Sequence, residues 1–249
     1  MKTQLVIFSL VFLGLSISGR ERAMPHTIPV VVRTITHDTG AFTQGLFYYK
    51  GLLYESTGLY GQSSLRILDA KDGSIRKTIP VPDIFAEGCA RMDSSLVQLS
   101  WREQGAPVYR FPSLELRSSL SYSGEGWGLT ADSALFYMSN GSDTLYARDK
   151  RFAIRKKIPV TFMGKPLQLL NELEYVKGLI YANVWYSDSI FVIQPRTGVV
   201  IRLIDCTSLV AQNAAPSNQN VLNGIAYNPE TRIFYITGKR WRYIFEVKL

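Results

Sequence analysis

Apolar and polar residues alternate with a period of two along most of the chain that follows residue 24. The alternating runs are rich in Leu, Ile, Val, Tyr and Phe, and they include GLLYEST at 51–57, GLIYANVW at 178–185 and RIFYITGK at 232–239. Asp-Gly, Thr-Gly, Pro-Ser and Asn-Gly pairs bound these runs. Short alternating runs between turn residues are typical of β-strands, and hardly any stretch beyond the N-terminal segment has a helical period. The pattern predicts an all-β protein.

A short motif recurs five times and divides the chain into units of roughly 40 to 50 residues. Each motif pairs a polar residue with glycine or a small apolar residue, and the five are FTQGLFYY from 42, FAEGCARM from 85, GEGWGLTA from 124, LNELEYVK from 170 and LNGIAYNP from 222. Two or three further strands follow each motif. Five such units predict a five-bladed β-propeller over residues 24–249. A two-sheet sandwich would explain the alternation but not five registered repeats.

The last unit ends at Leu249 after only three strands. A strand of the right character, TIPVVVRTITHD at 27–38, stands at the other end of the chain. We therefore expect this N-terminal strand to pair with the C-terminal YIFEVKL and to close the propeller.

The N-terminal segment has a different composition. Met1 and Lys2 precede the apolar run LVIFSLVFLGL and the small residues SISG, an order typical of a secretory signal. The run is too short for a comfortable membrane span, although a signal anchor is an alternative. We predict a signal peptide over residues 1–23, no stable membrane span after its cleavage, and a mature protein that is exported to the periplasm or secreted.

The composition allows one substantial core, since 46% of the 249 residues are hydrophobic. The formal net charge is +8, but the Lys and Arg residues are mostly scattered, so we expect no nucleic-acid partner. The two cysteines, Cys89 and Cys206, belong to different units, which favours two separate buried thiols over a disulfide. We expect a monomer.

In a propeller the first strand of each blade lines the central channel. This rule places five positions around one axis: Gln44, Glu87, Glu125 or Trp127, Asn171 or Glu172, and Asn223. Burial of a lone carboxylate is expensive. Glu87 is therefore expected to be one member of a polar ring that faces a hydrated channel, and such a ring could serve only to bind water and tie the blades together.

The motifs resemble those of one family in order and along nearly the whole chain after the signal: HDTGAFTQGL, YESTGLYGQSSLR, FAEGC, GEGWGLT, LNELEYVKGLIYANVW, and LNGIAYN followed by ITGKRW. The family is that of the plant and bacterial glutaminyl cyclases, or glutamine cyclotransferases. Thr39 and Cys89 depart from its usual residues. The resemblance implies a five-bladed propeller that converts the N-terminal glutamine of peptides or proteins into pyroglutamate and releases ammonia.

The resemblance also implies roles for individual residues. Glu87 matches the catalytic carboxylate that moves the proton, Gln44 and Asn171 match polar groups that hold the amide and its oxyanion, and Lys239 matches a lysine near the site. The aromatic wall of the substrate pocket corresponds to Phe42, Phe85, Trp101, Trp127 and Trp185. Packing between blades is an alternative for Trp101 and Trp185, and a solvated strand end is one for Lys239.

No cofactor or metal is expected. The only histidines, His26 and His37, both lie in the N-terminal segment, and the chain has no cysteine cluster. Two other functions remain open at this point. One is a propeller that binds a ligand or peptide without catalysis. The other is a metal-dependent hydrolase or lactonase in which Glu87, Asn171 and Asn223 supply oxygen ligands to Ca²⁺.

Overall fold

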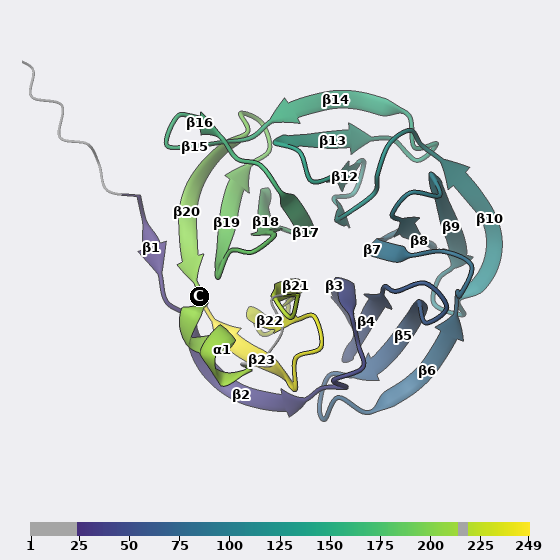
Figure 1. Ribbon diagram of the computed structural model, residues 1–249, viewed down its shortest axis with the longest axis horizontal. Coiled ribbons are helices and arrows are strands. Elements are labelled where there is room, and N and C mark those ends of the chain that lie inside the picture. Colours follow the sequence, from purple (N-terminus) through teal and green to yellow (C-terminus); the bar gives the residue numbers. More distant parts are fainter. Residues whose placement is uncertain (1–23, 214–218) are drawn as a thin grey trace, which may run out of the picture.

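Five β-sheets surround a common centre in the computed structural model, which describes residues 24–213 and 219–249. The first strand of a sheet lies near the centre and the fourth at the periphery (Figure 1). The predicted all-β, propeller-like architecture is confirmed. The signal peptide predicted for residues 1–23 lies outside the described residues.

Each of the first three repeats supplies one antiparallel sheet of four strands. The first sheet consists of β3 (Thr43–Tyr49), β4 (Leu52–Thr57), β5 (Ser64–Asp69) and β6 (Ile75–Pro80). The second consists of β7 (Ala86–Met92), β8 (Ser95–Ser100), β9 (Gly105–Arg110) and β10 (Glu115–Ser121). The third consists of β11 (Leu129–Ala131), β12 (Phe136–Met138), β13 (Thr144–Arg148) and β14 (Ile154–Pro159).

The fourth sheet carries additions that the sequence pattern did not predict. Its main strands are β17 (Leu170–Val176), β18 (Leu179–Val184), β19 (Ser189–Gln194) and β20 (Val199–Asp205). The short strands β1 (His26–Thr27) and β15 (Thr161–Phe162) pair with β20, and β16 (Lys165–Pro166) pairs with β15. Helix α1 (Thr207–Gln212) follows β20 and buries Leu209. These additions span two to six residues, too few to carry a periodic signal.

The fifth sheet joins the two ends of the chain. It consists of β21 (Leu222–Asn228), β22 (Ile233–Gly238), β23 (Tyr243–Lys248) and the N-terminal β2 (Val30–Thr36). Strand β2 runs antiparallel to β23 from Val30 opposite Lys248 to Thr36 opposite Tyr243. Arg33 in β2 also donates hydrogen bonds to the carboxylate of Glu246 in β23. The predicted closure by an N-terminal strand is confirmed.

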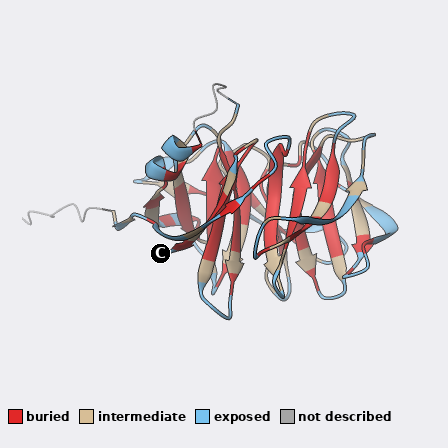
Figure 2. Ribbon diagram, turned by 90° about the horizontal axis from the view of Figure 1, so that it is seen from below, coloured by how far each residue is buried: buried red, intermediate tan, exposed pale blue. Residues whose placement is uncertain are grey.

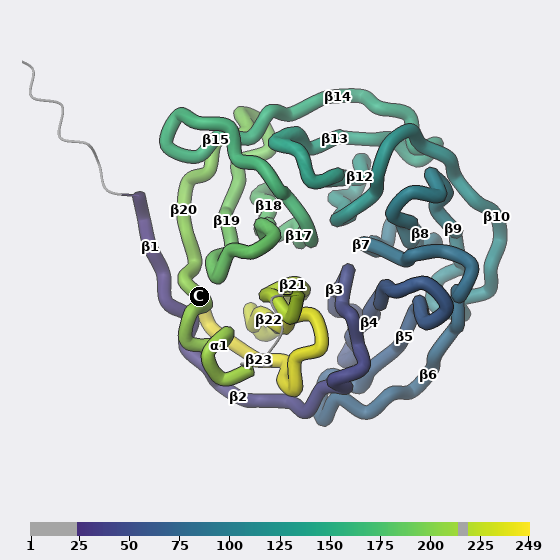
Figure 3. The backbone as a smooth tube through the Cα atoms, viewed as in Figure 1, coloured from purple at the N-terminus to yellow at the C-terminus, as the bar shows by residue number. Residues whose placement is uncertain are grey.

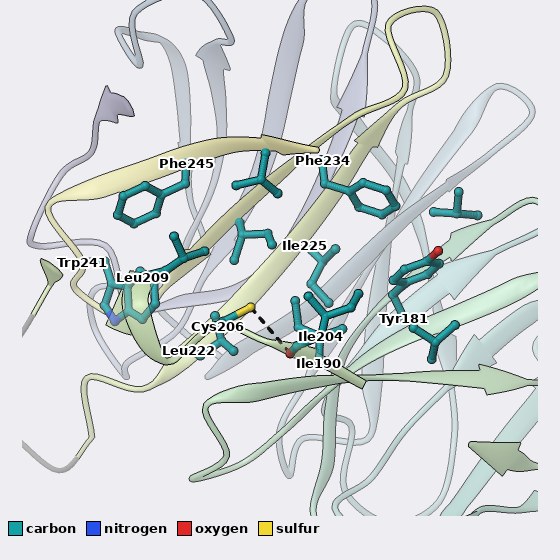
Figure 4. Close-up of a cluster of buried hydrophobic side chains, with 14 residues drawn as sticks. Tyr181, Ile190, Ile204, Cys206, Leu209, Leu222, Ile225, Phe234, Trp241 and Phe245 are labelled. Carbon is teal, nitrogen blue, oxygen red and sulfur yellow. Dashed lines mark hydrogen bonds between the residues drawn. The ribbon is translucent and has the colours of Figure 1, made fainter. Parts of the chain in front are cut away.

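Within residues 24–213 and 219–249, five apolar clusters form the core, each between two neighbouring sheets. Buried residues occupy the middle of the strands, whereas the connecting turns are exposed (Figure 2). The cluster between the fourth and fifth sheets includes Cys206, Leu209, Trp241 and Phe245 (Figure 4). Cys206 and Cys89 are both buried free thiols, as predicted. Because every sheet contributes to two clusters, apolar burial holds all neighbours together.

A buried ion pair supports the closure. Nε2 of His37, just after β2, lies 2.8 Å from Oε1 of Glu55 in β4, and its Nδ1 lies 3.0 Å from the carbonyl oxygen of Trp241. Burial disfavours the charged forms, but the attraction between the two groups raises the pKa of His37 and lowers the pKa of Glu55. His37 is therefore held protonated beside an ionised Glu55.

We expect His37→Ala to lower the free energy of unfolding by about 3 to 5 kcal/mol, because it leaves the buried Glu55 carboxylate with only the hydrogen bond from Thr43 and the ion pair with Arg66 at 3.9 Å. His37 contributes its full stabilisation of the fold below pH 6.5, which is the pKa of histidine in the unfolded chain. This stabilisation is lost as pH rises through the raised pKa of His37 in the folded protein. Glu55 contributes its full stabilisation of the fold above pH 4.5, the pKa of glutamate in the unfolded chain. This stabilisation is lost as pH falls through the lowered pKa of Glu55 in the folded protein. Denaturant unfolding across pH measures both limits.

His26→Ala is the matched control, because the His26 side chain is half exposed and lies 3.5 Å from Asp205. We expect it to change the free energy of unfolding by less than about 1 kcal/mol. The loss of unfolding free energy in His37→Ala should therefore vary with pH. A loss that stays constant from acid to alkaline pH would contradict the buried ion pair.

Candidate active site

A cavity of about 210 Å³ opens among side chains of the inner strands β3, β7 and β17 and the connections beside them. Its lining includes all nine residues predicted for the site: Phe42, Gln44, Phe85, Glu87, Trp101, Trp127, Asn171, Trp185 and Lys239. Sequence reasoning missed two further lining residues, Leu59 and Gln219. Leu59 lies between β4 and β5 and Gln219 between α1 and β21, and neither the repeat pattern nor the resemblance assigned a role to these positions.

The inner strands converge because glycine lets their backbones approach (Figure 3). A Cβ atom added at Gly88 would lie 2.4 Å from the backbone nitrogen of Leu129, and one added at Gly128 would lie 1.9 Å from the carbonyl oxygen of Asn171. Both distances are too short for non-bonded atoms, so only glycine fits. The close approach brings side chains from different sheets around one small cavity.

β-Bulges lie at the cavity end of four inner strands. The register shifts fall between Thr43 and Gly45, Ala86 and Cys89, Leu170 and Leu173, and Leu222 and Ile225. A bulge interrupts the alternation of a strand and redirects a side chain, and bulges are frequent beside active sites. Gln44, Glu87 and Asn171 each lie inside one of these shifts, which is why their side chains share the cavity.

Glu87 is only 4% exposed and is not a lone carboxylate. The amide Nε2 of Gln44 donates a hydrogen bond of 2.9 Å to its Oε1. Asn223 Nδ2 lies 3.3 Å from Gln44 Oε1 and donates to the carbonyl oxygen of Thr43 at 2.9 Å, so it holds Gln44 in turn. Burial raises the pKa of Glu87 well above its ordinary value, although the charge of Lys239 opposes this rise. A carboxyl with a raised pKa is suited to proton transfer.

Lys239 is buried rather than a solvated strand end. Its Nζ lies 4.8 Å from the ring centre of Phe42 and 5.6 Å from that of Trp185, and the residue is 4% exposed. Burial lowers its pKa to about 8, against the opposing influence of Glu87. The aromatic rings stabilise a cation here, and Lys239 places a positive charge beside the Glu87 carboxyl.

The aromatic side chains form a wall by edge-to-face contact. Phe85 contacts Phe42 at 6.2 Å and Trp101 at 5.5 Å between ring centres, and Trp127 contacts Trp185 at 5.4 Å. Such contacts fix the planes of neighbouring rings. Trp101 and Trp185 therefore both pack and line the cavity.

Two buried polar atoms on the cavity lining have no hydrogen-bond partner among the described residues. They are Oδ1 of Asn171 and Nε1 of Trp185. A buried polar atom without a partner is costly, so the cavity wall contains two polar groups whose hydrogen-bonding capacity is not used within the protein. The cavity thus combines an ionisable carboxyl, a cation, amide groups and an aromatic wall.

Residues 6–249 match the family described as glutamine cyclotransferase. The chain belongs to the glutamine cyclotransferase family. It is 34% identical over 240 residues to the glutaminyl-peptide cyclotransferase of Arabidopsis thaliana. The aligned residues cover 93% of this chain and 75% of the relative. It also resembles the crystal structure of glutaminyl cyclase from Myxococcus xanthus, with a TM-score of 0.86 and 35% identity over 90% of this chain and 97% of that one.

Three other channel candidates do not line the cavity of this glutamine cyclotransferase family member: Glu125, Glu172 and Asn223. Glu172 is 1% exposed and spans the inner strands, since its two oxygens accept hydrogen bonds from the backbone nitrogens of Leu46 and Ile225 at 3.3 and 2.9 Å. Burial raises its pKa well above the ordinary value. Glu172 and Asn223 thus support neighbouring inner strands, whereas Asn171 and Trp127 reach the cavity.

The described part of this cyclotransferase family member contains neither a group of metal-binding side chains nor a membrane-spanning helix. Residues 24–213 and 219–249 contain no group of three or more His, Cys, Asp and Glu side chains placed to hold a metal ion. None of the helices in these ranges is long and apolar enough to cross a membrane.

Proposed function

We propose that this protein converts the N-terminal glutamine of peptides and proteins into pyroglutamate and releases ammonia. The observation that carries the proposal is the buried Glu87 carboxyl, which shares a small aromatic cavity with Lys239. The names of its plant and bacterial relatives support the same activity.

In the proposed reaction, the α-amine nitrogen of the substrate attacks the carboxamide carbon of the same residue. A carbon–nitrogen bond forms within the new ring, and the bond to the side-chain nitrogen breaks. Glu87 takes a proton from the attacking amine and delivers a proton to the departing nitrogen, which leaves as ammonia. Glu87 ends the cycle as it began, so the reaction needs no other reactant.

Positioning of the substrate and stabilisation of the oxyanion supply the rest of the proposed rate acceleration. Ring closure joins two groups of one residue, so a wall that folds the side chain onto its own amine lowers the barrier. The rings of Phe42, Phe85 and Trp127 are suited to this task. The side-chain amide of Asn171 and the charge of Lys239 would stabilise the oxyanion that forms on the carboxamide oxygen.

We further propose that the five sheets act as the five blades of one catalytic propeller. The protein would work as a monomer, exported to the periplasm or secreted after cleavage of the predicted signal. The apolar run and small residues within residues 1–23 support export.

Ammonia release from a glutaminyl dipeptide, with mass analysis of the product, tests the proposed function. We expect stoichiometric ammonia and pyroglutamyl product, and no turnover of the same dipeptide with an acetylated amine. Binding without ammonia release would instead favour a non-catalytic binding propeller.

Asn171→Ala should lower kcat by roughly 10² to 10³, because it removes a proposed donor to the oxyanion. Steady-state kinetics on the same dipeptide measures the effect. Asn183→Ala is a control, since Asn183 Oδ1 accepts a hydrogen bond from the backbone nitrogen of Gly224 and the residue does not line the cavity. An Asn171→Ala enzyme with the parent kcat would exclude this donor.

Prolonged dialysis against EDTA should leave the rate unchanged, because the proposed steps use only carboxyl, amide and ammonium groups. Activity before and after dialysis, with metal content measured in parallel, checks this expectation. Loss of activity that Ca²⁺ or Zn²⁺ restores would favour the metal-dependent alternative.

A further inference from the structure

One carboxylate oxygen holds two tryptophans of the cavity wall. Oε2 of Glu125 accepts hydrogen bonds from Nε1 of Trp101 at 2.8 Å and from Nε1 of Trp127 at 3.0 Å. Trp101 directly follows β8 of the second sheet, and Trp127 precedes β11 of the third. Glu125 therefore connects wall residues from two different sheets.

The other oxygen of the carboxylate is anchored as well. Nε of Arg102 donates to Oε1 of Glu125 at 3.2 Å, and the guanidinium carbon of Arg102 lies 3.7 Å from the ring centre of Trp101. Trp101 is thus held at its ring edge by Glu125 and on its face by Arg102. An indole held at both places has little freedom to rotate.

Glu125 stays ionised. Its partial burial favours the neutral form, but hydrogen bonds from Trp127, Trp101 and Arg102 outweigh this effect and lower the pKa of Glu125. A charged acceptor forms stronger hydrogen bonds with N–H donors than a neutral one. The anchoring of both indoles therefore persists at neutral and alkaline pH.

We propose that Glu125 is a positioning residue for glutaminyl cyclisation, which acts by fixing the indoles of Trp101 and Trp127 rather than by touching the substrate. Both indoles line the cavity, whereas Glu125 does not. The inference rests on the proposed function, because the fixed wall is what folds the glutamine side chain onto its own amine.

A purely electrostatic role is the competing explanation. The negative charge of Glu125 contributes to the raised pKa of Glu87, and so does that of Glu103. The two roles differ in what they require of residue 125. Positioning requires an acceptor that reaches both indoles, whereas an electrostatic role requires only the charge.

Two conservative variants separate these requirements. Glu125→Gln keeps the reach and an acceptor oxygen but loses the charge, and Glu125→Asp keeps the charge but shortens the side chain by one methylene group. Both should fold, because the Glu125 side chain is 37% exposed. Glu103→Gln is the matched control. Glu103 accepts a hydrogen bond from the hydroxyl of Tyr60, and the substitution removes a second negative charge that raises the pKa of Glu87.

The kinetic readout is KM and kcat for a glutaminyl dipeptide. We expect Glu125→Asp to lower kcat/KM by about tenfold or more, mainly through kcat, because a wall that has lost one charge-assisted hydrogen bond no longer holds the glutamine side chain folded onto its amine. Glu125→Gln weakens these bonds by removing the charge but keeps an acceptor that reaches both indoles, so it should lose clearly less than Glu125→Asp, and Glu103→Gln should match the parent. Equal losses in both Glu125 variants, or a greater loss in Glu125→Gln, would overturn the proposal.

Tryptophan fluorescence provides a second readout that does not depend on turnover. The chain has four tryptophans, and Trp241 is held elsewhere by a hydrogen bond to the carbonyl oxygen of Asn220. We expect a red-shifted emission in Glu125→Asp and parent-like emission in Glu125→Gln. Parent-like emission in Glu125→Asp would overturn the anchoring. Absence of ammonia release from the parent would defeat the proposed function alone, since the emission still tests the anchoring.

Discussion

Replacement of Glu87 by glutamine is expected to lower kcat by roughly 10² to 10⁴ and to leave KM nearly unchanged. The substitution keeps the size of the side chain and a side-chain oxygen that can accept the hydrogen bond from Gln44 Nε2. It removes the only group of residue 87 that can take a proton from the attacking amine and return one to the leaving nitrogen. Ammonia release under steady-state and single-turnover conditions measures the effect on chemistry.

Glu172→Gln is the control for this prediction. Glu172 is also a buried carboxyl with a raised pKa, but its oxygens accept from the backbone nitrogens of Leu46 and Ile225 and it does not line the cavity. We expect its effect to fall on the melting temperature rather than on kcat. A Glu87→Gln protein that melts like the parent and cyclises glutaminyl peptides at the parent rate would remove Glu87 from the mechanism.

Deletion of residues 24–36 from the mature chain should abolish cooperative folding. It removes β2, whose six residue pairs with β23 complete the fifth sheet. The deletion also removes Ile35, which is 2% exposed and packs in the cluster between the fifth and first sheets, and the bonds of Arg33 to Glu246. The edge of β23 would be left open, and the junction of the two chain ends would be lost.

Thermal melting followed by circular dichroism checks this prediction. Deletion of residues 24–28 is the control, because it removes β1 and its two residue pairs with β20 but spares β2. We expect a cooperative transition close to that of the mature chain for the shorter deletion and none for the longer one. Equal melting of the longer deletion and the mature chain would show that β2 is dispensable.

The sequence by itself determined the sheets and their closure. A strand presents alternate residues to opposite faces, so alternation of apolar and polar residues identified strands wherever the neighbouring sheets bury one face. Repetition of the motifs separated the sheets, and the missing strand of the last repeat identified its partner at the other end of the chain. Short additions such as α1 and β15 escaped detection, because a few residues do not establish a period.

The sequence also placed the nine candidate residues, with help from the resemblance to the glutamine cyclotransferases. The repeat alone left two choices open, between Asn171 and Glu172 and between Glu125 and Trp127. Asn171 and Glu172 are adjacent and would face opposite sides of a regular strand, but β17 has a bulge at this pair. Glu125 and Trp127 are two residues apart and would share a face of a regular strand, but both precede β11. Local pattern does not decide orientation at such positions.

Only the tertiary structure decided the environments of the charged groups. The sequence left a solvated strand end open for Lys239, yet the residue is buried beside Phe42 and Trp185 from other parts of the chain, and burial lowers its pKa to about 8. Glu125 has the sequence of a channel residue, yet it lies behind two indoles brought together by neighbouring sheets. Burial and hydrogen bonding depend on groups that are distant in sequence, and the folded chain alone fixes their distances.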